Sequence, residues 1–239
     1  MIASYKVLSA VLSYPTAELQ AAADEMIEAL SLEHLLSPDD CAAVGTLIRT
    51  IAEGDLLDVQ SQYVDLFDRT RALSLHLFEH VHGESRDRGQ AMVSLLERYR
   101  ESGIDIQANE LPDYIPLFLE FLSLQTPDEA RAMLSEPSHI LAALSERLLA
   151  RGSSYAVVFQ TLVTLSQSKP DMEILSGLRE TEIEDPNDLV ALDQMWEETE
   201  VRFGPGDAQD DNCPRASDLL RQMEAQPVVK AQPETGERL

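Results

Sequence analysis

The sequence is short of cysteine and of aromatic residues, and these shortages exclude several kinds of protein. Its two cysteines, Cys41 and Cys213, lie far apart, so they indicate neither a disulfide framework nor a cysteine-rich metal site. A reducing compartment suits such a chain. Aromatic residues make up only 5% of the 239 residues, and the helix formers Ala, Leu, Glu and Gln dominate, which favours helices over strands.

Basic residues are also scarce. The chain has 18 Lys and Arg against 43 Asp and Glu, which gives a formal net charge of -25. Such a surface repels phosphate backbones and anionic lipids, so we expect no nucleic acid among its partners. It attracts basic peptides, but acidity also serves solubility, and the composition leaves both explanations open.

Long hydrophobic runs are missing as well. No segment reaches the roughly 20 apolar residues that span a bilayer. The N-terminal stretch, MIASYKVLSAVLSYP, carries a lysine and shows helical spacing rather than a signal-peptide cleavage site. We therefore expect a cytoplasmic protein that is neither exported nor inserted into a membrane.

The sequence contains none of the common motifs of enzymatic chemistry. It has no phosphate-binding glycine loop, no G-x-G-x-x-G, no H-E-x-x-H and no G-x-S-x-G. Carboxylates are abundant, but nothing places two of them across a cleft. The prediction is a protein that catalyses no reaction and carries no cofactor.

Apolar residues recur at helical spacing up to about residue 203, and no period-2 pattern competes with them. This pattern predicts an all-α, single-domain helical bundle over residues 1–203. Four residues that precede helical segments are expected to be N-caps, because their hydroxyl oxygens accept from first-turn amides. They are Thr16, Ser37, Thr126 and Ser153.

Two regions stand apart from this pattern. Residues 112–123 are apolar almost all round, with Asp113, Glu120 and Ser123 as the clearly polar members, which predicts a helix at the centre of the bundle with Pro112 in its first turn. From residue 204 onward too few apolar residues remain to offset the entropy of ordering. Residues 204–239 are predicted to form an acidic, mostly disordered and flexible tail.

The residues from 76 to 92 are the richest in chemical groups. His76 and His80 would share one helix face, and Glu79 with His82 has the spacing of half a carboxylate-bridged metal site. The sequence offers no second half-site, so the alternative is that these histidines cap a helix end or hydrogen-bond at its surface. Gly89, inside a helical pattern, indicates close helix packing or the approach of another chain.

Two charged patterns permit a binding role. Asp55, Asp58, Gln62 and Asp65 form a polar row at helical spacing, opposite an apolar face that contains Tyr63. Such a row is either simply solvated or forms the rim of a groove for a basic amphipathic peptide. Around Gly89, the charges alternate in sign, which fits a solvated salt-bridge cluster or a polar rim for a bound segment. They are Glu84, Arg86, Asp87 and Arg88.

Three sequence strings carry a resemblance to a known family. They are YVDLFDR at 63–69, LFEHVHGESRDRGQAM at 77–92 and ELPDYIPL at 110–117. Together they resemble the molybdenum cofactor assembly chaperones of respiratory nitrate reductase, the delta subunit family. The likeness extends from the N-terminal LSYP string to about residue 203. It implies the all-helical fold of the redox-enzyme maturation chaperones.

The resemblance also implies a function and a set of residues. By this likeness the protein binds the apo catalytic alpha subunit of nitrate reductase, including its basic N-terminal leader-like segment. It would support insertion of the molybdenum cofactor and iron–sulfur clusters before membrane docking, and would not be part of the mature complex. The residues expected to bind the partner are Tyr63, Asp65, Leu66, Phe67, Asp68, His80, His82, Glu84, Arg86, Asp87, Arg88, Glu110, Pro112, Asp113 and Tyr114.

Tyr114 departs from the pattern of the wider family, in which a histidine commonly follows this aspartate. A role that needs an imidazole is therefore in doubt at this position, while a hydrogen-bonding or stacking role remains. In the predicted mechanism the leader segment docks between the helices of residues 63–67 and 115–122. Its basic charges then meet Asp55, Asp58, Asp65, Asp113 and Glu120. The rival hypotheses are a metal-binding helical enzyme that uses His76, Glu79, His80 and His82, and a generic helical adaptor.

Overall fold

The computed structural model describes residues 1–69, 71–80, 86–104, 106 and 110–180. Within these residues the chain is all-α, as predicted, and no β-strand is present. The predicted tail at 204–239, and the domain boundary at residue 203, lie outside the described residues. No helix in this part of the chain is both long and apolar enough to cross a membrane.

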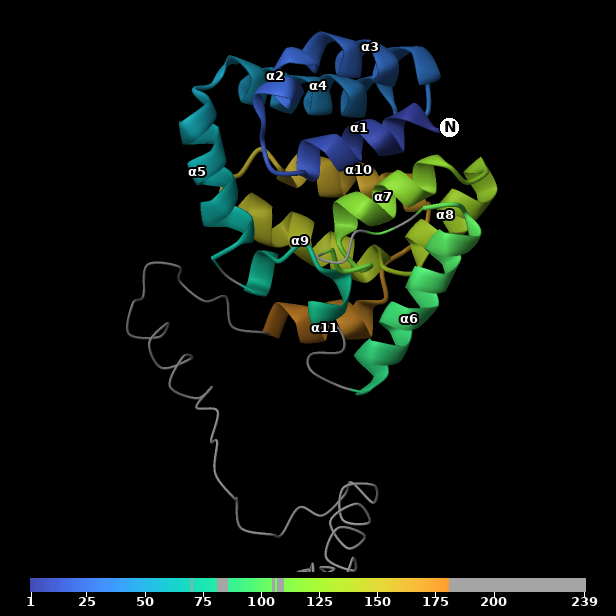
Figure 1. Ribbon diagram of the computed structural model, residues 1–239. Helices are drawn as coiled ribbons and strands as arrows, with labels where there is room; N and C mark the ends of the chain where they lie inside the picture. The colour runs from blue at the N-terminus through green and yellow to red at the C-terminus, as the bar shows by residue number, and fades with distance from the viewer. Residues whose placement is uncertain (70, 81–85, 105, 107–109, 181–239) are drawn as a thin grey trace, which may run out of the picture. The chain divides into compact units, whose positions relative to one another are not determined.

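The helices follow one another with short connections (Figure 1). Their bounds are α1 Ala3–Leu12, α2 Ala17–Ala21, α3 Ala23–Glu33, α4 Pro38–Glu53, α5 Leu56–Phe67, α6 Arg86–Glu101, α7 Ile115–Ser123, α8 Pro127–Ser135, α9 Ser138–Ala150, α10 Ala156–Ser166 and α11 Met172–Glu180. Two short 3₁₀ helices, η1 Arg71–Leu73 and η2 Leu77–Glu79, connect α5 to the segment before α6.

Helix starts follow the local sequence closely. The hydroxyls of Thr16, Ser37 and Thr126 accept hydrogen bonds from amides of the first turn, as predicted, and Thr126 forms a complete capping box with Glu129. Ser153 was predicted wrongly, because α10 begins three residues later, at Ala156. Asp55 of the predicted acidic row is itself a cap, since its carboxylate accepts from the amides of Leu57 and Asp58.

The core forms around α1 and α7, which pack along each other, while α3 covers α1 and α9 packs against α10. In Figure 1, α1 lies between α3 and α7. The carboxylate of Glu33 on α3 accepts from the first amides of α1, at 2.8 Å from Ala3 N and 2.6 Å from Ser4 N. This contact satisfies donors that a helix N-terminus leaves free.

Helix α7 occupies the central place that its apolar sequence predicts, and Glu120 is its one exposed residue. Its start was predicted wrongly. The helix begins at Ile115 with Pro116 in the first turn, so Asp113 lies before it. A proline fits the first turn because its missing N–H has no partner there in any helix.

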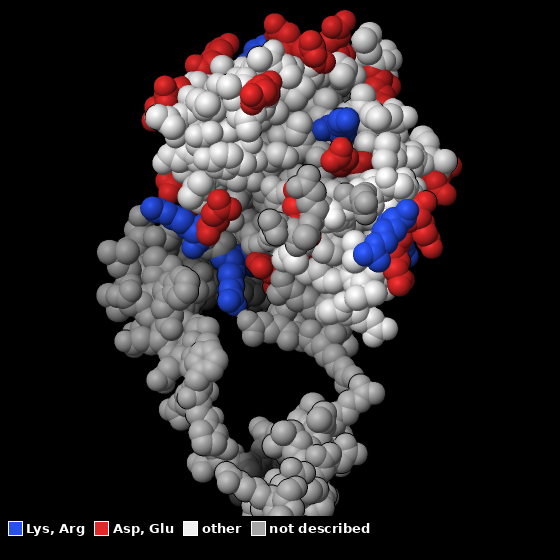
Figure 2. Space-filling model, viewed as in Figure 1, with Lys and Arg blue, Asp and Glu red and all other residues white. Residues whose placement is uncertain are grey.

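Charged side chains lie mainly on the surface. Figure 2 shows Asp and Glu atoms gathered at the α3/α4 end of one face, while Lys and Arg atoms form a few separate patches. The predicted row of Asp55, Asp58, Gln62 and Asp65 is exposed along α5, and Asp65 pairs with Arg69 at 3.1 Å. The opposite face of α5 buries Val59, Tyr63 and Phe67, as its spacing predicts.

Candidate partner-binding site

Two segments that are far apart in sequence pair in antiparallel fashion at the start of α7. The Leu77 amide donates to the Asp113 carbonyl at 3.0 Å, and the Ile115 amide donates to the Leu75 carbonyl at 2.8 Å. His76 and Tyr114 form an isolated antiparallel bridge between them. We call residues 75–78 and 113–115 the crossing. Its backbone hydrogen bonds fix the positions of the side chains on both sides of the crossing.

Asp113 holds the crossing together from inside. Its side chain is fully buried, and its two oxygens lie 3.2 Å from His76 Nδ1 and 3.1 Å from the Phe78 amide that donates to it. Buried carboxylates are stable only when their oxygens have such donors. The expectation that Asp113 meets a partner's charge at the rim is therefore wrong, because no partner can reach a wholly enclosed side chain.

One side of the crossing carries a small cavity of about 170 Å³, which we call the tyrosine cavity. Tyr63 donates to the carbonyl of Leu12 at 2.8 Å, and its hydroxyl lies 3.3 Å from that of Tyr114. Burial raises the pKa of both phenols, so the hydroxyls stay protonated at neutral pH. The residues that line the cavity are Tyr14, Tyr63, Phe67, Asp68, Leu75, His76 and Tyr114.

Aromatic rings make up most of the wall of the tyrosine cavity. The ring centroids of Tyr14 and Tyr63 are 5.6 Å apart with an edge-on geometry, and those of His76 and Tyr114 are 5.4 Å apart. Phe67 packs on Tyr63 with centroids 4.9 Å apart. These contacts span four separate segments of the chain, so the cavity exists only in the folded state.

Asp68 gives the tyrosine cavity its charge. Among the residues that line the cavity it is the single carboxylate, and neither Lys nor Arg is among them. Within the described residues no hydrogen bond or ion pair engages its carboxylate oxygens. Burial raises the pKa of Asp68, and the nearby His76 opposes this shift. The carboxylate of Asp68 thus has no cationic partner in the described part of the chain.

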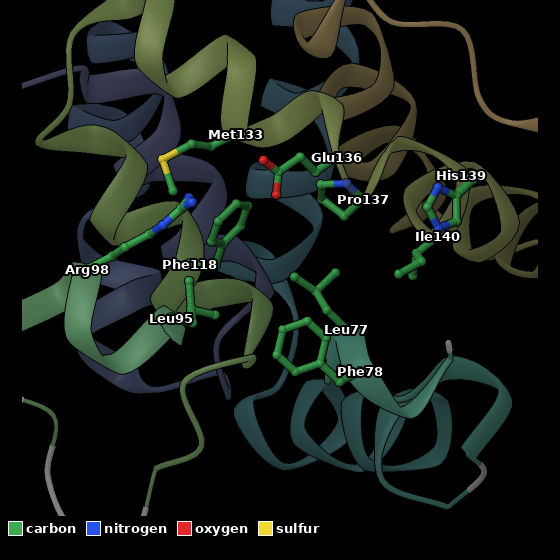
Figure 3. Close-up of a pocket in the computed structure, with 10 residues that line it drawn as sticks. All are labelled: Leu77, Phe78, Leu95, Arg98, Phe118, Met133, Glu136, Pro137, His139 and Ile140. Atoms are coloured by element: carbon green, nitrogen blue, oxygen red, sulfur yellow. The ribbon is translucent and has the colours of Figure 1, made fainter. Parts of the chain in front are cut away.

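The other side of the crossing carries an apolar cavity of about 200 Å³ (Figure 3). Leu77 and Phe78 of η2 lie on one side of it, and Phe118 of α7 and Leu95 of α6 lie on another. Arg98, Glu136 and His139 supply polar groups at its edges. A cavity of this kind suits an apolar side chain of a bound segment.

Comparison with known proteins gives the family. A family described as nitrate reductase delta subunit matches residues 33–161. The chain is 45% identical over 197 residues to NarJ of Escherichia coli K12, a nitrate reductase molybdenum cofactor assembly chaperone; the match covers 82% of this chain and 83% of NarJ. The chain belongs to the nitrate reductase delta subunit family. Members of this family are assembly chaperones rather than catalytic enzymes.

Two further relatives support the assignment. NarW of Escherichia coli K12, a probable chaperone of the same type, is 38% identical over 200 residues, which are 83% of this chain and 82% of NarW. The nitrate reductase-like protein NarX of Mycobacterium tuberculosis CDC 1551 is 31% identical over 151 residues, which are 62% of this chain and 22% of NarX.

The two strings at 63–68 and 110–114, on which the sequence resemblance was based, meet at the crossing. Tyr63 and Phe67 are buried, while Asp68 and Tyr114 line the tyrosine cavity. The buried Pro112 accepts through its carbonyl from the Tyr99 hydroxyl at 2.8 Å. Other predicted residues of these motifs lie outside the cavity: Asp65 and Glu110 are exposed and Leu66 is half-buried.

The third delta-family string is only partly described. His82 and Glu84 lie outside the described residues, as do the side chains of Arg86, Asp87 and Arg88 in the first turn of α6. An added Cβ on Gly89 would meet nothing within 4 Å. Close helix packing at Gly89 is therefore not seen in the described part of the chain.

The helix expected at residues 76–82 was predicted wrongly over the part that the structure describes, residues 76–80. His76 has an extended backbone, and only Leu77–Glu79 form a single 3₁₀ turn. The ring of His80 donates from Nε2 to the Ser74 carbonyl at 2.8 Å, and burial lowers the pKa of His80. Within the described residues no group of three His, Cys, Asp or Glu side chains is placed to hold a metal ion.

Sequence reasoning missed three residues of the site. Tyr14 was noted only as part of the LSYP string, yet it lines the tyrosine cavity from the loop after α1. His76 was considered as a metal ligand, a helix cap or a surface hydrogen-bonding residue, and Phe78 only as part of a string, whereas both contact the buried carboxylate of Asp113. An aromatic residue before Pro15 was the one available signal for Tyr14, and it does not indicate which cavity the ring enters.

Proposed function

We propose that this protein is the assembly chaperone of a respiratory nitrate reductase and binds the apo alpha subunit while the molybdenum cofactor is inserted. One observation carries the proposal. The two family motifs, 63–68 and 110–114, come from distant parts of the chain and meet at one surface beside the acidic helix α5. Motif residues that pack only for stability would lie in the core, yet Asp68 and Tyr114 line an open cavity.

The segment of the alpha subunit that binds here is its basic, leader-like N-terminus. Its apolar side chains suit the two cavities that flank the crossing, and its basic side chains suit the exposed carboxylates of α5 and α7. These carboxylates are Asp58 and Asp65 on α5 and Glu120 on α7, with Asp55 at the start of α5. A partly helical segment that fills an apolar groove with a charged rim is a common mode of peptide recognition.

The mechanism requires no chemistry from this chain. By occupying the N-terminal segment, the chaperone keeps the alpha subunit open for the molybdenum cofactor and iron–sulfur clusters, and delays its docking at the membrane. Both steps take place in the cytoplasm. The chaperone then leaves, and the mature complex does not contain it.

Deletion of the gene tests the function in the cell. The nitrate reductase purified from the deletion strain should contain an intact alpha subunit with little molybdenum cofactor, and the wild-type gene should restore the cofactor content. Mature, fully loaded nitrate reductase in the deletion strain contradicts the proposal.

Calorimetry with a synthetic peptide of the alpha-subunit N-terminus tests the surface. The full chain should bind the peptide with an affinity that falls as salt rises, because salt screens exposed charges beyond roughly 8–10 Å. Asp65→Lys should weaken binding by up to about fivefold at low salt, which is the range of an exposed ion pair. Asp24→Lys on α3 is the matched control, since Asp24 is exposed like Asp65 but lies on a helix outside the proposed acidic rim. Equal affinities of Asp65→Lys and Asp24→Lys for the peptide would contradict a role for the acidic row of α5 in binding.

A further inference from the structure

We propose that Arg147, which lines neither of the two cavities beside the crossing, is a positioning residue for the partner-binding site. It joins α11, the last helix in the described part of the chain, to η1, the turn that leads into the crossing. Docking of α11 and binding of the partner then support each other. The inference rests on the proposed function for the identity of the partner, but the link itself belongs to the free protein.

Arg147 is a buried cation held by carbonyl oxygens. Its side chain is 7% exposed, and its guanidinium donates to the carbonyl of Ala72 at 2.7 Å and to that of Leu178. No carboxylate in the described part of the chain forms an ion pair with it. A buried charge is stable only when its hydrogen bonds are made, so the loss of either carbonyl is unfavourable.

The residues around this guanidinium belong to three elements that are distant in sequence. Leu178 lies in the last turn of α11, where carbonyls have no partner within the helix, and Ala72 lies in η1. Arg147 itself lies in the last turn of α9. Helix C-termini carry partial negative charge, which stabilises a cation placed beside them. One side chain thus holds α9, α11 and η1 together.

The turn η1 passes this restraint on to the crossing. Leu75 follows Ala72 by three positions, and its carbonyl accepts from the first amide of α7 at 2.8 Å. Between them, the carbonyl of Ser74 accepts from Nε2 of His80 at 2.8 Å. The segment therefore has little freedom to adjust locally. A shift of η1 moves Leu75 and His76, which line the tyrosine cavity.

Helix α11 has few contacts that keep it in place. It lies at the edge of the bundle beside α9 (Figure 1). Among its described side chains only Leu175 and Leu178 are buried. The pair of Arg179 with Glu146 is exposed, and exposed pairs contribute little to stability. A cavity of about 130 Å³ separates parts of α9 and α11. Segments with so few buried contacts open locally, which makes the link through Arg147 decisive for α11.

Such a link acts in both directions. When docked α11 holds the crossing in its binding geometry, a bound partner stabilises docked α11 by the same factor. Couplings between sites range from about 5-fold to 150-fold. We expect a coupling of about fivefold, because the backbone hydrogen bonds of the crossing also hold the segment after η1.

Hydrogen exchange of the free, full-length chain tests the link without any partner. Arg147→Lys removes one of the two hydrogen bonds, and Leu178→Ala loosens α11 from the other end. Each variant should speed exchange about fivefold or more in both segments 71–78 and 172–180. Faster exchange in 172–180 alone overturns the inference, and so does unchanged exchange in both segments. The two variants are independent, so one that does not fold leaves the other to decide.

Leu30→Ala is the matched control. Leu30 is 1% exposed and belongs to α3, which packs on α1 and α4, so its truncation costs stability without touching the link. It should leave segments 71–78 and 172–180 exchanging no faster than the rest of the chain. Selective acceleration of the two segments in Leu30→Ala would show that general softening explains the effect, and would overturn the role of Arg147.

The alpha-subunit peptide tests the effect on binding. By calorimetry, Arg147→Lys and Leu178→Ala should weaken its affinity about fivefold, and Leu30→Ala less than about twofold. Bound peptide should slow exchange in 172–180 of wild type about fivefold, and Arg147→Lys should abolish this slowing. A purely structural Arg147 would leave α11 indifferent to the peptide, which overturns the inference. A peptide that does not bind wild type sinks the proposed function, while exchange in the free chain still decides whether Arg147 links α11 to the crossing.

Discussion

Replacing Asp113 tests how the site is built, because this one side chain joins both segments of the crossing. In Asp113→Ala the Phe78 amide loses its acceptor and His76 loses the oxygen at 3.2 Å. A buried donor without a partner costs about 1–3 kcal/mol. The His76 side chain is 29% exposed and can turn to water, so the Phe78 amide carries most of the penalty. We expect a loss of about 2–4 kcal/mol in the free energy of unfolding.

Asp113→Asn is the matched variant. Its amide oxygen can still accept from Phe78, and its NH₂ group can donate to Nδ1 of His76 in the other tautomer. The expected loss is therefore only about 1 kcal/mol. Thermal unfolding followed by circular dichroism should place Asp113→Ala roughly 4–16 °C below wild type, since 1 kcal/mol corresponds to about 2–4 °C in a chain of this size.

Partner binding should follow the same order. His76 and Tyr114 lose their fixed positions when the crossing loosens, so the affinity for the alpha-subunit peptide should fall more in Asp113→Ala than in Asp113→Asn. An Asp113→Ala protein that unfolds within 1–2 °C of wild type would refute the reasoning, because it would mean that the buried acceptor contributes nothing net.

Three other predictions concern different parts of the fold. Arg147→Lys should speed amide hydrogen exchange in α11 by about fivefold or more. The guanidinium of Arg147 donates to the carbonyls of Ala72 and Leu178, and a single ammonium cannot span both. Unchanged exchange would show that other contacts hold α11. Asp68→Asn should be at least as stable as wild type at pH 7, because a pKa raised by burial means that the fold disfavours the charged carboxylate. A clear loss in the free energy of unfolding, measured by chemical denaturation, would contradict this. The free energy of unfolding should also fall above about pH 10, by up to about 1.4 kcal/mol per pH unit for each buried tyrosine, because these tyrosines resist ionisation in the folded state while those of the unfolded chain ionise. Urea midpoints between pH 9 and 11, measured together with tyrosinate absorbance, check this prediction. A midpoint that does not change with pH would count against it. The tyrosines whose pKa burial raises are Tyr5, Tyr63, Tyr99, Tyr114 and Tyr155, the last to about 12.

The spacing of apolar residues was sufficient to predict the helices and the core. Spacing of apolar residues predicted the buried face of α5, and the nearly all-apolar stretch around residues 115–123 predicted the central position of α7. Hydroxyl residues before helices predicted three of four N-caps. These features depend on residues within one or two turns of each other, so sequence alone contains the physical information.

The same local rules failed where long-range contacts take over. Residues 76–82 have helical spacing, but the backbone of His76 pairs with that of Tyr114 instead, and within the described residues 76–80 only one 3₁₀ turn forms. Ser153 could cap a helix, yet α10 begins at Ala156. In the first case a tertiary hydrogen-bond partner replaced the one that a local helix would have supplied.

By itself the sequence determined the all-helical class, the acidic surface, the absence of catalytic motifs and, through three strings, the family. Only the tertiary structure decided which residues share a surface and which are enclosed. It placed Asp113 in the interior and left Asp68 open, although both are aspartates within the strings that carry the sequence resemblance. The reason is that the burial of a side chain depends on segments far away in the chain: Asp113 is enclosed by a partner 37 positions away, and Tyr63 reaches Tyr114 across 51.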